Sequence, residues 1–168
     1  MKAMVHVRPC VESDLAQLND IYNHYVATSA ATFDLQPVPM EVRRDWFMRY
    51  ALTGPHRLFV ATDGDLVLGY ADSHQVRPKP AYITSIETSI YLAPDATGRG
   101  VGTALYEALF SALQDEDVHR AYAAITDIPN PASVALHERF GFRPIGTFRE
   151  QGRKFGRYWD VEWYEKEL

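Results

Sequence analysis

The stretch that decides the fold lies at residues 97–102 and reads Thr97-Gly98-Arg99-Gly100-Val101-Gly102. Three alternating glycines let a backbone turn tightly and approach a ligand closely. Free amides at the start of a following helix, together with the helix dipole, favour an anion such as phosphate. Arg99 adds a charge and donors suited to phosphate. The run therefore predicts either a phosphate-binding turn or a plain flexible loop between a strand and a helix.

Two common nucleotide-binding motifs fit this turn poorly. Its pattern is G-x-G-x-G rather than the G-x-G-x-x-G of dinucleotide-binding folds, and it comes late in the chain. It also lacks the Gly-Lys ending of a P-loop, because Thr103 follows Gly102. An NAD-dependent oxidoreductase is therefore the weakest of the enzyme hypotheses.

Hydrophobic periodicity on both sides of the turn predicts alternating strands and helices. Strands are expected at residues 5–8, 58–62, 66–71, 81–92, 118–126, 142–148 and 158–166. Helices are expected after Ser13 as N-cap, after Pro39, at residues 100–114, and from Asn130 to Gly141. The helix after Pro39 is expected to bury Val42, Trp46, Phe47 and Tyr50. This order predicts one domain, residues 1–168, of the mixed α/β class with helices on both faces of the sheet.

Composition narrows the possible partners. The net charge of −5 argues against a nucleic-acid partner, since such proteins usually carry a basic excess. No apolar run approaches the roughly 20 residues of a membrane span, so no membrane association is expected. The single cysteine, Cys10, cannot form an internal disulfide, which favours the cytoplasm. The histidines show no metal-ligand spacing, so no metal is expected.

Two segments carry a resemblance to a known family. Residues 90–105, Ile90-Tyr91-Leu92-Ala93-Pro94-Asp95 followed by Gly98-Arg99-Gly100-Val101-Gly102-Thr103-Ala104-Leu105, resemble motif A of the GNAT superfamily of N-acetyltransferases. Residues 130–142 resemble motif B. Residues 21–25, 85–89 and 154–157 resemble the phosphinothricin and methionine-sulfoximine acetyltransferases within that superfamily. Thr97 departs from motif A, which usually has Gln or Arg there, and His137 replaces a tyrosine that many members use as general acid.

The resemblance implies a fold and an activity. The fold is a central, mixed, mostly antiparallel twisted sheet of about seven strands flanked by about four helices. The activity is direct transfer of an acetyl group from acetyl-CoA to the amine of a small glutamate- or methionine-like amino acid, without a covalent enzyme intermediate. Cys10 has no neighbouring histidine or aspartate in sequence that would activate it as a nucleophile. A homodimer is implied as well.

The same resemblance assigns residues to acetyl-CoA. The diphosphate of acetyl-CoA is expected to bind the glycine-rich turn and the start of the next helix. The pantetheine arm is expected to bind the edge of the strand that precedes the turn, where the Leu92 N–H would polarise the thioester carbonyl. Asn130 is assigned to the pantetheine amides, with helix capping alone as the alternative. Ser133, three residues later, is assigned to the same cofactor-binding set. The complete set is Ile90, Tyr91, Leu92, Gly98, Arg99, Gly100, Val101, Gly102, Thr103, Asn130 and Ser133.

Two residues are candidates for proton transfer. Glu87 stands in an otherwise apolar and hydroxylated strand, where partial burial would raise its pKa toward a value useful for a general base. The alternative is a glutamate paired with an arginine or facing solvent. His137 is expected either to protonate the leaving thiolate or to serve as a structural histidine.

Substrate recognition rests on Arg77, which the resemblance aligns with an arginine that grips a substrate carboxylate, as a guanidinium does in a two-point contact. A solvated loop charge is the alternative. Ile83 stands where many relatives have a second arginine, which hints at a different or less charged amine. Phe33 and Tyr25 are candidate pocket aromatics, with core packing as the alternative. A protein or peptide N-acetyltransferase and a non-catalytic acyl-CoA-binding module remain open as other functions.

Overall fold

The computed structural model describes residues 4–168, so residues 1–3 of the expected domain lie outside the described residues. The strands are β1 (His6–Pro9), β2 (Leu58–Asp63), β3 (Leu66–Gln75), β4 (Ser85–Leu92), β5 (Arg120–Ile125), β6 (Arg143–Lys154) and β7 (Arg157–Glu167). The α-helices are α1 (Leu15–Thr28), α2 (Met40–Phe47), α3 (Val101–Leu113) and α4 (Pro131–Arg139). These elements alternate along the chain in the expected order.

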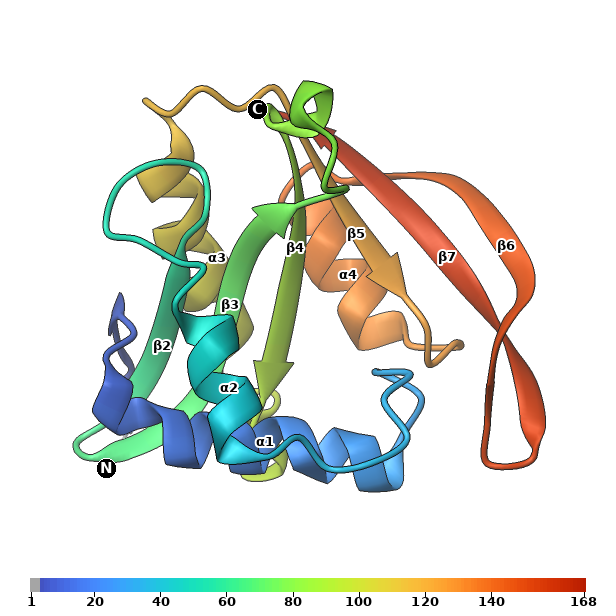
Figure 1. Ribbon diagram of the computed structural model, residues 1–168, viewed down its shortest axis with the longest axis horizontal. Helices are drawn as coiled ribbons and strands as arrows, with labels where there is room; N and C mark the ends of the chain where they lie inside the picture. The colour runs from blue at the N-terminus through green and yellow to red at the C-terminus, as the bar shows by residue number, and fades with distance from the viewer. Residues whose placement is uncertain (1–3) are drawn as a thin grey trace.

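All seven strands join one sheet in the order β1-β2-β3-β4-β5-β7-β6 (Figure 1). Every neighbouring pair is antiparallel except β4 and β5, which run parallel. The prediction of a mixed, mostly antiparallel sheet with four helices is therefore confirmed. The β6–β7 hairpin extends beyond the body of the molecule (Figure 1).

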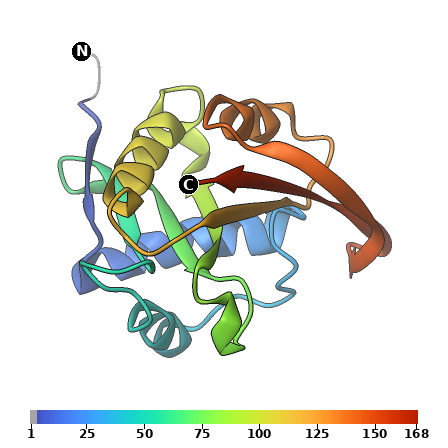
Figure 2. The same cartoon turned by 90° about the horizontal axis from the view of Figure 1, so that it is seen from above.

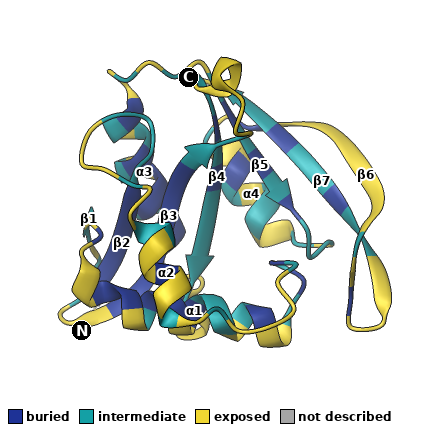
Figure 3. Ribbon diagram, viewed as in Figure 1, coloured by how far each residue is buried: buried dark blue, intermediate teal, exposed yellow. Residues whose placement is uncertain are grey.

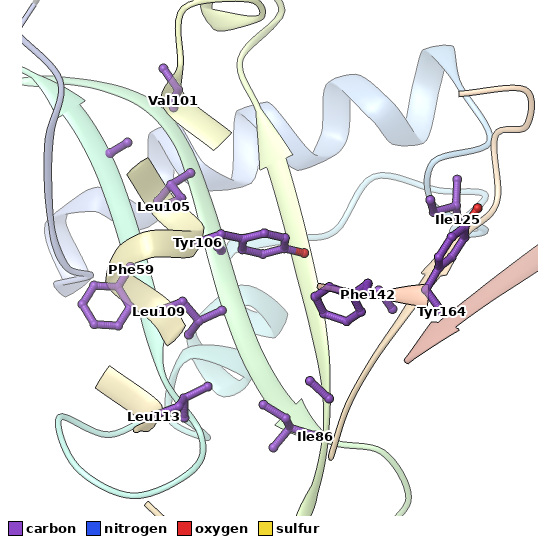
Figure 4. Packing of buried hydrophobic residues seen from close by; sticks show 14 of the residues in the cluster. Phe59, Ile86, Val101, Leu105, Tyr106, Leu109, Leu113, Ile125, Phe142 and Tyr164 are labelled. Carbon is purple, nitrogen blue, oxygen red and sulfur yellow. The ribbon is translucent and has the colours of Figure 1, made fainter. Parts of the chain in front are cut away.

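Helices cover both faces of the sheet, because alternate strand residues point to opposite sides. Figure 2 shows α3 and α4 on one side and α1 and α2 on the other. The α3 side holds the larger core, in which the predicted stripe of Val101, Leu105, Leu109 and Leu113 is fully buried. In Figure 4, Tyr106 extends its ring from α3 toward Phe142. The α1 side holds a second core of Leu15, Leu18 and Ile21 against β2 and β3.

Several local predictions were wrong. Ser13 does not cap α1, because Glu12–Asp14 forms a short 3-10 helix and Asp14 occupies the N-cap. The Asp14 carboxylate accepts the Val11 N–H at 2.9 Å and pairs with Arg8 at 2.7 Å. The strand expected from residue 81 begins at Ser85, since Pro80–Tyr82 forms another 3-10 turn.

One of the four residues expected to be buried by α2 is not: Trp46, Phe47 and Tyr50 pack, partly buried, against the core on the α1 side, but Val42 does not. Val42 is 49% exposed, whereas Arg43 is 4% exposed. The guanidinium of Arg43 lies 4.5 Å from the ring centroids of both Tyr22 and Trp46, and its Nε donates to Asn19. Arg43 can occupy this inward position because its guanidinium stacks on two rings and makes a buried hydrogen bond. The hydrophobic pattern of the sequence predicts an apolar residue at such a position.

Candidate functional site

The site forms where β4 and β5 separate. Their parallel ladder joins only Ser85–Glu87 to Arg120–Tyr122, and beyond Glu87 the two strands diverge. A cavity of about 680 Å³ lies along the separated part of β4 and reaches α3 and α4. The expected acetyl-CoA segments all contribute to its lining: Ile90, Tyr91, Leu92, Gly98, Gly100, Val101, Gly102, Thr103, Asn130 and Ser133.

The backbone of β4 offers hydrogen bonds to this cavity. Ala93 N–H donates to the Leu68 carbonyl at 2.8 Å, which makes Leu92 and Gly69 a non-hydrogen-bonded pair of the antiparallel ladder. The N–H groups of Leu92 and, two residues earlier, Ile90 therefore point away from β3, toward the opening beside β5. The Tyr25 hydroxyl donates to the Leu92 carbonyl and holds this end of the strand. Tyr25, an expected pocket residue, thus lines the cavity and also fixes its edge.

The glycine-rich turn is built for close approach of a ligand to backbone. Gly98 and Gly100 have φ of +72° and +79°, a region that costs a side-chain-bearing residue energy, and nothing lies within 4 Å of where a Cβ would stand. The first bond within α3 runs from Ala104 N–H to the Gly100 carbonyl at 3.1 Å. The amides of Val101, Gly102 and Thr103 thus lack helical partners, as at any helix start, and are available to an anion.

The basic side chain at this end of the cavity differs from the one expected. Arg99 is not among the lining residues and lies 3.7 Å from Asp63 across an exposed ion pair. Arg139 of α4 does line the cavity and donates to the Thr103 hydroxyl at 3.1 Å. Its place in motif B was the available signal, but sequence alone does not show that the end of α4 reaches the start of α3.

Glu87 projects from β4 into the same cavity. Burial raises the pKa of its carboxyl, a nearby His74 and Arg77 oppose that rise, and Asp72 adds to it. The side chain keeps 24% of its surface exposed, so it is reachable from the cavity. A carboxylate with a raised pKa and open access is suited to accept a proton from an amine.

His137 is held by both ring nitrogens. Its Nδ1 lies 2.7 Å from the Ser133 carbonyl, which can only accept, so Nδ1 carries a proton. Its Nε2 lies 2.9 Å from the Tyr106 hydroxyl, and that hydroxyl lies 3.2 Å from Thr88 Oγ1. Burial lowers the pKa of His137, opposed by the bond to Ser133. The ring is thus neutral at ordinary pH, and its Nε2 accepts a hydrogen bond from the Tyr106 hydroxyl.

Asn130 caps α4 as expected. Its side-chain oxygen accepts the Ser133 N–H at 3.1 Å, its amide donates to Asp127 at 3.0 Å, and Pro131 occupies the first helical position. The helix is followed by Gly141 with φ of +84°. Asn130 also lines the cavity, so the residue that caps α4 stands at the wall of the site.

A second cavity of about 710 Å³ lies on the α1–α2 side of the sheet and contains Arg77. Ser89 and Tyr91 of β4 line both cavities, so the two are neighbours. Phe33 lines the first cavity, and Gly152 of the β6–β7 hairpin lies so close to its ring that a Cβ there would clash with it. Ile83 is 55% exposed and lines neither cavity.

Two residues that line the second cavity, Asp72 and His74, were not predicted from the sequence. Asp72 and His74 follow residue 71, where the expected strand ended, but β3 continues to Gln75. Asp72 is buried, and its Oδ1 lies 2.7 Å from His74 Nδ1. His74 Nε2 lies 3.8 Å from Glu87 Oε2. Only the strand register, which places His74 opposite Glu87, reveals this cluster.

Other sequence candidates lie elsewhere. Cys10 is buried at the end of β1, and burial raises the pKa of its thiol to about 12, which suppresses its nucleophilic form. Within residues 4–168, no group of three or more His, Cys, Asp or Glu side chains is arranged to hold a metal ion. In that same part of the chain, no helix has the length and apolar character needed to cross a membrane.

Comparison with known proteins places this geometry in context. Residues 18–142 match the family described as "Acetyltransferase (GNAT) family". The chain is 58% identical to a phosphinothricin N-acetyltransferase of Streptomyces coelicolor, over 99% of this chain and 98% of the relative. It is 34% identical to an L-methionine sulfoximine/L-methionine sulfone acetyltransferase of Pseudomonas aeruginosa, over 96% of this chain and 94% of the relative. A crystal structure of a phosphinothricin acetyltransferase from Sinorhizobium meliloti in complex with AcCoA superposes with a TM-score of 0.87 at 30% identity, covering 100% of this chain and 89% of that one.

Proposed function

The chain belongs to the GNAT acetyltransferase family, and from that premise we propose that it moves the acetyl group of acetyl-CoA to the primary amine of a phosphinothricin- or methionine-sulfoximine-type amino acid. The observation that carries the proposal is the opening between β4 and β5, which brings the amides of a helix start, a free strand edge and Glu87 to one cavity. Acetyl transfer needs these three parts: a binding site for the diphosphate, a strand edge that binds the pantetheine arm, and a general base.

Acetyl-CoA binding follows from the backbone. The amides of residues 101–103 hold the diphosphate, with Arg139 as the nearby cation. The pantetheine arm lies along the β4 edge, as an added strand would, and the Leu92 N–H polarises the thioester carbonyl. Support for the last role is the ladder register, which turns this N–H toward the cavity.

Proton transfer is assigned to Glu87. The ammonium group of the substrate gives one proton to the Glu87 carboxylate and becomes a nucleophile. Its lone pair forms the C–N bond, the C–S bond breaks, and the second amine proton ends on the coenzyme A thiolate. The transfer is direct, within one ternary complex.

For His137 we favour the positioning role over the general-acid role. Both of its ring nitrogens have partners, and the ring is neutral, so it has no spare proton for a thiolate. A thiol with a pKa of about 8.5 also leaves without strong need of an acid. His137 orients Tyr106 and, through it, Thr88 at the wall of the cavity.

Arg77 is proposed to bind the substrate carboxylate from the second cavity, close enough that its charge acts on Glu87. We expect Arg77→Ala to raise KM for amino-acid substrates about 10- to 100-fold with little change in kcat, because a charge-assisted contact shared by ground and transition states is lost. Steady-state kinetics measure this. Arg44→Ala, an exposed arginine of α2, is the matched control. If Arg77→Ala raises KM equally for the corresponding amine that lacks the carboxylate, Arg77 does not bind the carboxylate.

The proposed activity is tested by thiol release from acetyl-CoA with a panel of amino acids, sulfoximines, sulfones and phosphinates, run beside short peptides. Turnover of free amino acids supports the proposal. Turnover of peptides alone would favour a protein N-acetyltransferase, and binding of acetyl-CoA without turnover of any amine would favour a non-catalytic module.

We also propose a homodimer, supported by exposed apolar residues on the β6–β7 hairpin. Figure 3 shows that most of β6 is coloured as exposed. Ile145, Phe148, Phe155 and Tyr158 are each at least half exposed, a density that marks an interaction surface. Sedimentation velocity should give twice the 19.1 kDa chain mass, and Phe148→Glu should shift it to the monomer. A wild-type monomer at micromolar concentration would contradict this. The cytoplasmic location stays a prediction.

A further inference from the structure

A histidine–aspartate pair stands directly beside Glu87. His74 faces Glu87 across the β3–β4 ladder, so both side chains lie on the α1–α2 face of the sheet. Asp72, two residues before His74, shares that face and is buried, and its carboxylate contacts His74 Nδ1 at 2.7 Å. His74 Nε2 is turned toward Glu87, 3.8 Å from Oε2. The three side chains therefore form one row of contacts.

Asp72 fixes which nitrogen of His74 carries the proton in the neutral ring. A carboxylate only accepts, so Nδ1 keeps its hydrogen and donates it to Asp72. The lone pair then stands on Nε2, the nitrogen that faces Glu87. The 3.8 Å separation is longer than a hydrogen bond, as catalytic contacts often are before substrate binds.

The row connects the two cavities. Glu87 lines the cavity assigned to acetyl-CoA, whereas Asp72 and His74 line the second cavity. The His74 side chain is 39% exposed, so its ring reaches solvent from that side. A proton taken up at Glu87 thus has a direct exit that avoids the space filled by the thioester.

We propose that His74, held by Asp72, relays the substrate's proton from Glu87 to solvent and so restores the base in each turnover. The relay rests on the proposed role of Glu87. The ammonium group gives a proton to Glu87, and the Glu87 O–H gives it to His74 Nε2, which forms an imidazolium between two carboxylates. Nε2 then releases that proton to water. The reaction as a whole releases one proton, since the other amine proton stays on coenzyme A.

Titratable and charged groups from four segments lie around His74. Burial opposes its protonation, but the hydrogen bond and charge of Asp72 and the charge of Glu87 outweigh it and raise the pKa of His74. Arg49, just beyond α2, opposes them. His56, before β2, is also near: burial lowers its pKa, and the charge of His74 lowers it further. His74 and Glu87 thus titrate as a coupled pair, and the ring accepts a proton only at a pH above its raised pKa.

The test is the pH dependence of kcat for the wild type, Asp72→Asn and His74→Gln with one amino-acid substrate. Asp72→Asn keeps a hydrogen-bond acceptor but removes the charge that raises the pKa of His74. We expect its acid limb to move to lower pH by about one unit and its kcat plateau to fall about tenfold. His74→Gln should lose the limb that belongs to His74, keep the limb that belongs to the Glu87 carboxylate, and reduce kcat about 10- to 100-fold. Because Asp72 also raises the pKa of Glu87, the His74→Gln profile decides: a structural role for His74 would lower kcat at every pH and leave the wild-type limb in place.

Controls separate the relay from the base. His119→Gln, at an exposed histidine, should match the wild type. Thermal melting checks that each variant folds. If Glu87→Gln turns over like the wild type, the base assignment itself fails. If Glu87→Gln is inactive while the acid limb is unmoved in Asp72→Asn and His74→Gln, the base stands and the relay is refuted.

Discussion

Replacing Glu87 by Gln is expected to lower kcat/KM about 100- to 1,000-fold near neutral pH, within the range that removal of a general base produces. Glutamine keeps the shape of the side chain but accepts no proton, so the substrate ammonium group stays protonated. The deficit should shrink as the pH approaches the pKa of the free amine, because solvent then supplies the neutral nucleophile. Steady-state rates from about pH 6 to about pH 10 measure both effects.

The sign of the pH dependence follows from the burial of Glu87. Burial raises its pKa, so the active carboxylate is lost on acidification at a higher pH than for an ordinary glutamate. Glu107→Gln, at an exposed position of α3, is the matched control and should retain wild-type rates. A Glu87→Gln enzyme with an unchanged rate and pH profile would rule out the base.

Replacing Gly100 by Val is expected to weaken acetyl-CoA binding at least about 100-fold, equivalent to roughly 2.7 kcal/mol. Gly100 has φ of +79° at the start of α3, where a β-branched residue is strained and its side chain would occupy the open space in front of the helix amides. Losing even one or two hydrogen bonds to a charged diphosphate accounts for this magnitude. Titration calorimetry gives the affinity directly.

A control must show that Gly100→Val weakens binding through loss of the anion site and not only through backbone strain. Gly54 has φ of +85° in a loop that lines neither cavity, and nothing lies within 4 Å of where its Cβ would stand. Gly54→Val therefore carries a similar backbone penalty without touching the turn. If Gly54→Val and Gly100→Val weaken acetyl-CoA binding equally, the effect comes from stability, and the turn has no special part in binding.

The sequence was sufficient for features that depend on local chemistry. Strong periodicity predicted α3, and the Asn130-Pro131 start with the Gly141 stop predicted α4, because capping and glycine freedom act within a few residues. The motif resemblance then supplied the fold and the cavity-lining segments. The roles of Glu87, His137 and Arg77 stay predictions for experiment.

The remaining features depend on contacts between distant segments. Arg43 is buried because Tyr22 and Trp46 flank it, which no pattern within α2 reveals. Arg139 reaches the turn only through the packing of α4 against the start of α3. The pairing of His74 with Glu87 requires the register of two strands. Ser13 does not cap α1 because it lies inside the 3-10 helix Glu12–Asp14, whose last residue contacts Arg8 and Val11.

The proposed function depends most on one event, the binding of coenzyme A between β4 and β5. Isothermal titration of acetyl-CoA into the folded wild-type protein tests it directly. We predict saturable binding at one site per chain, with a rise in melting temperature that grows with ligand concentration. If the folded protein shows neither heat of binding nor a shift in melting temperature at millimolar acetyl-CoA, the opening between the strands is not a coenzyme site and the proposed function is wrong.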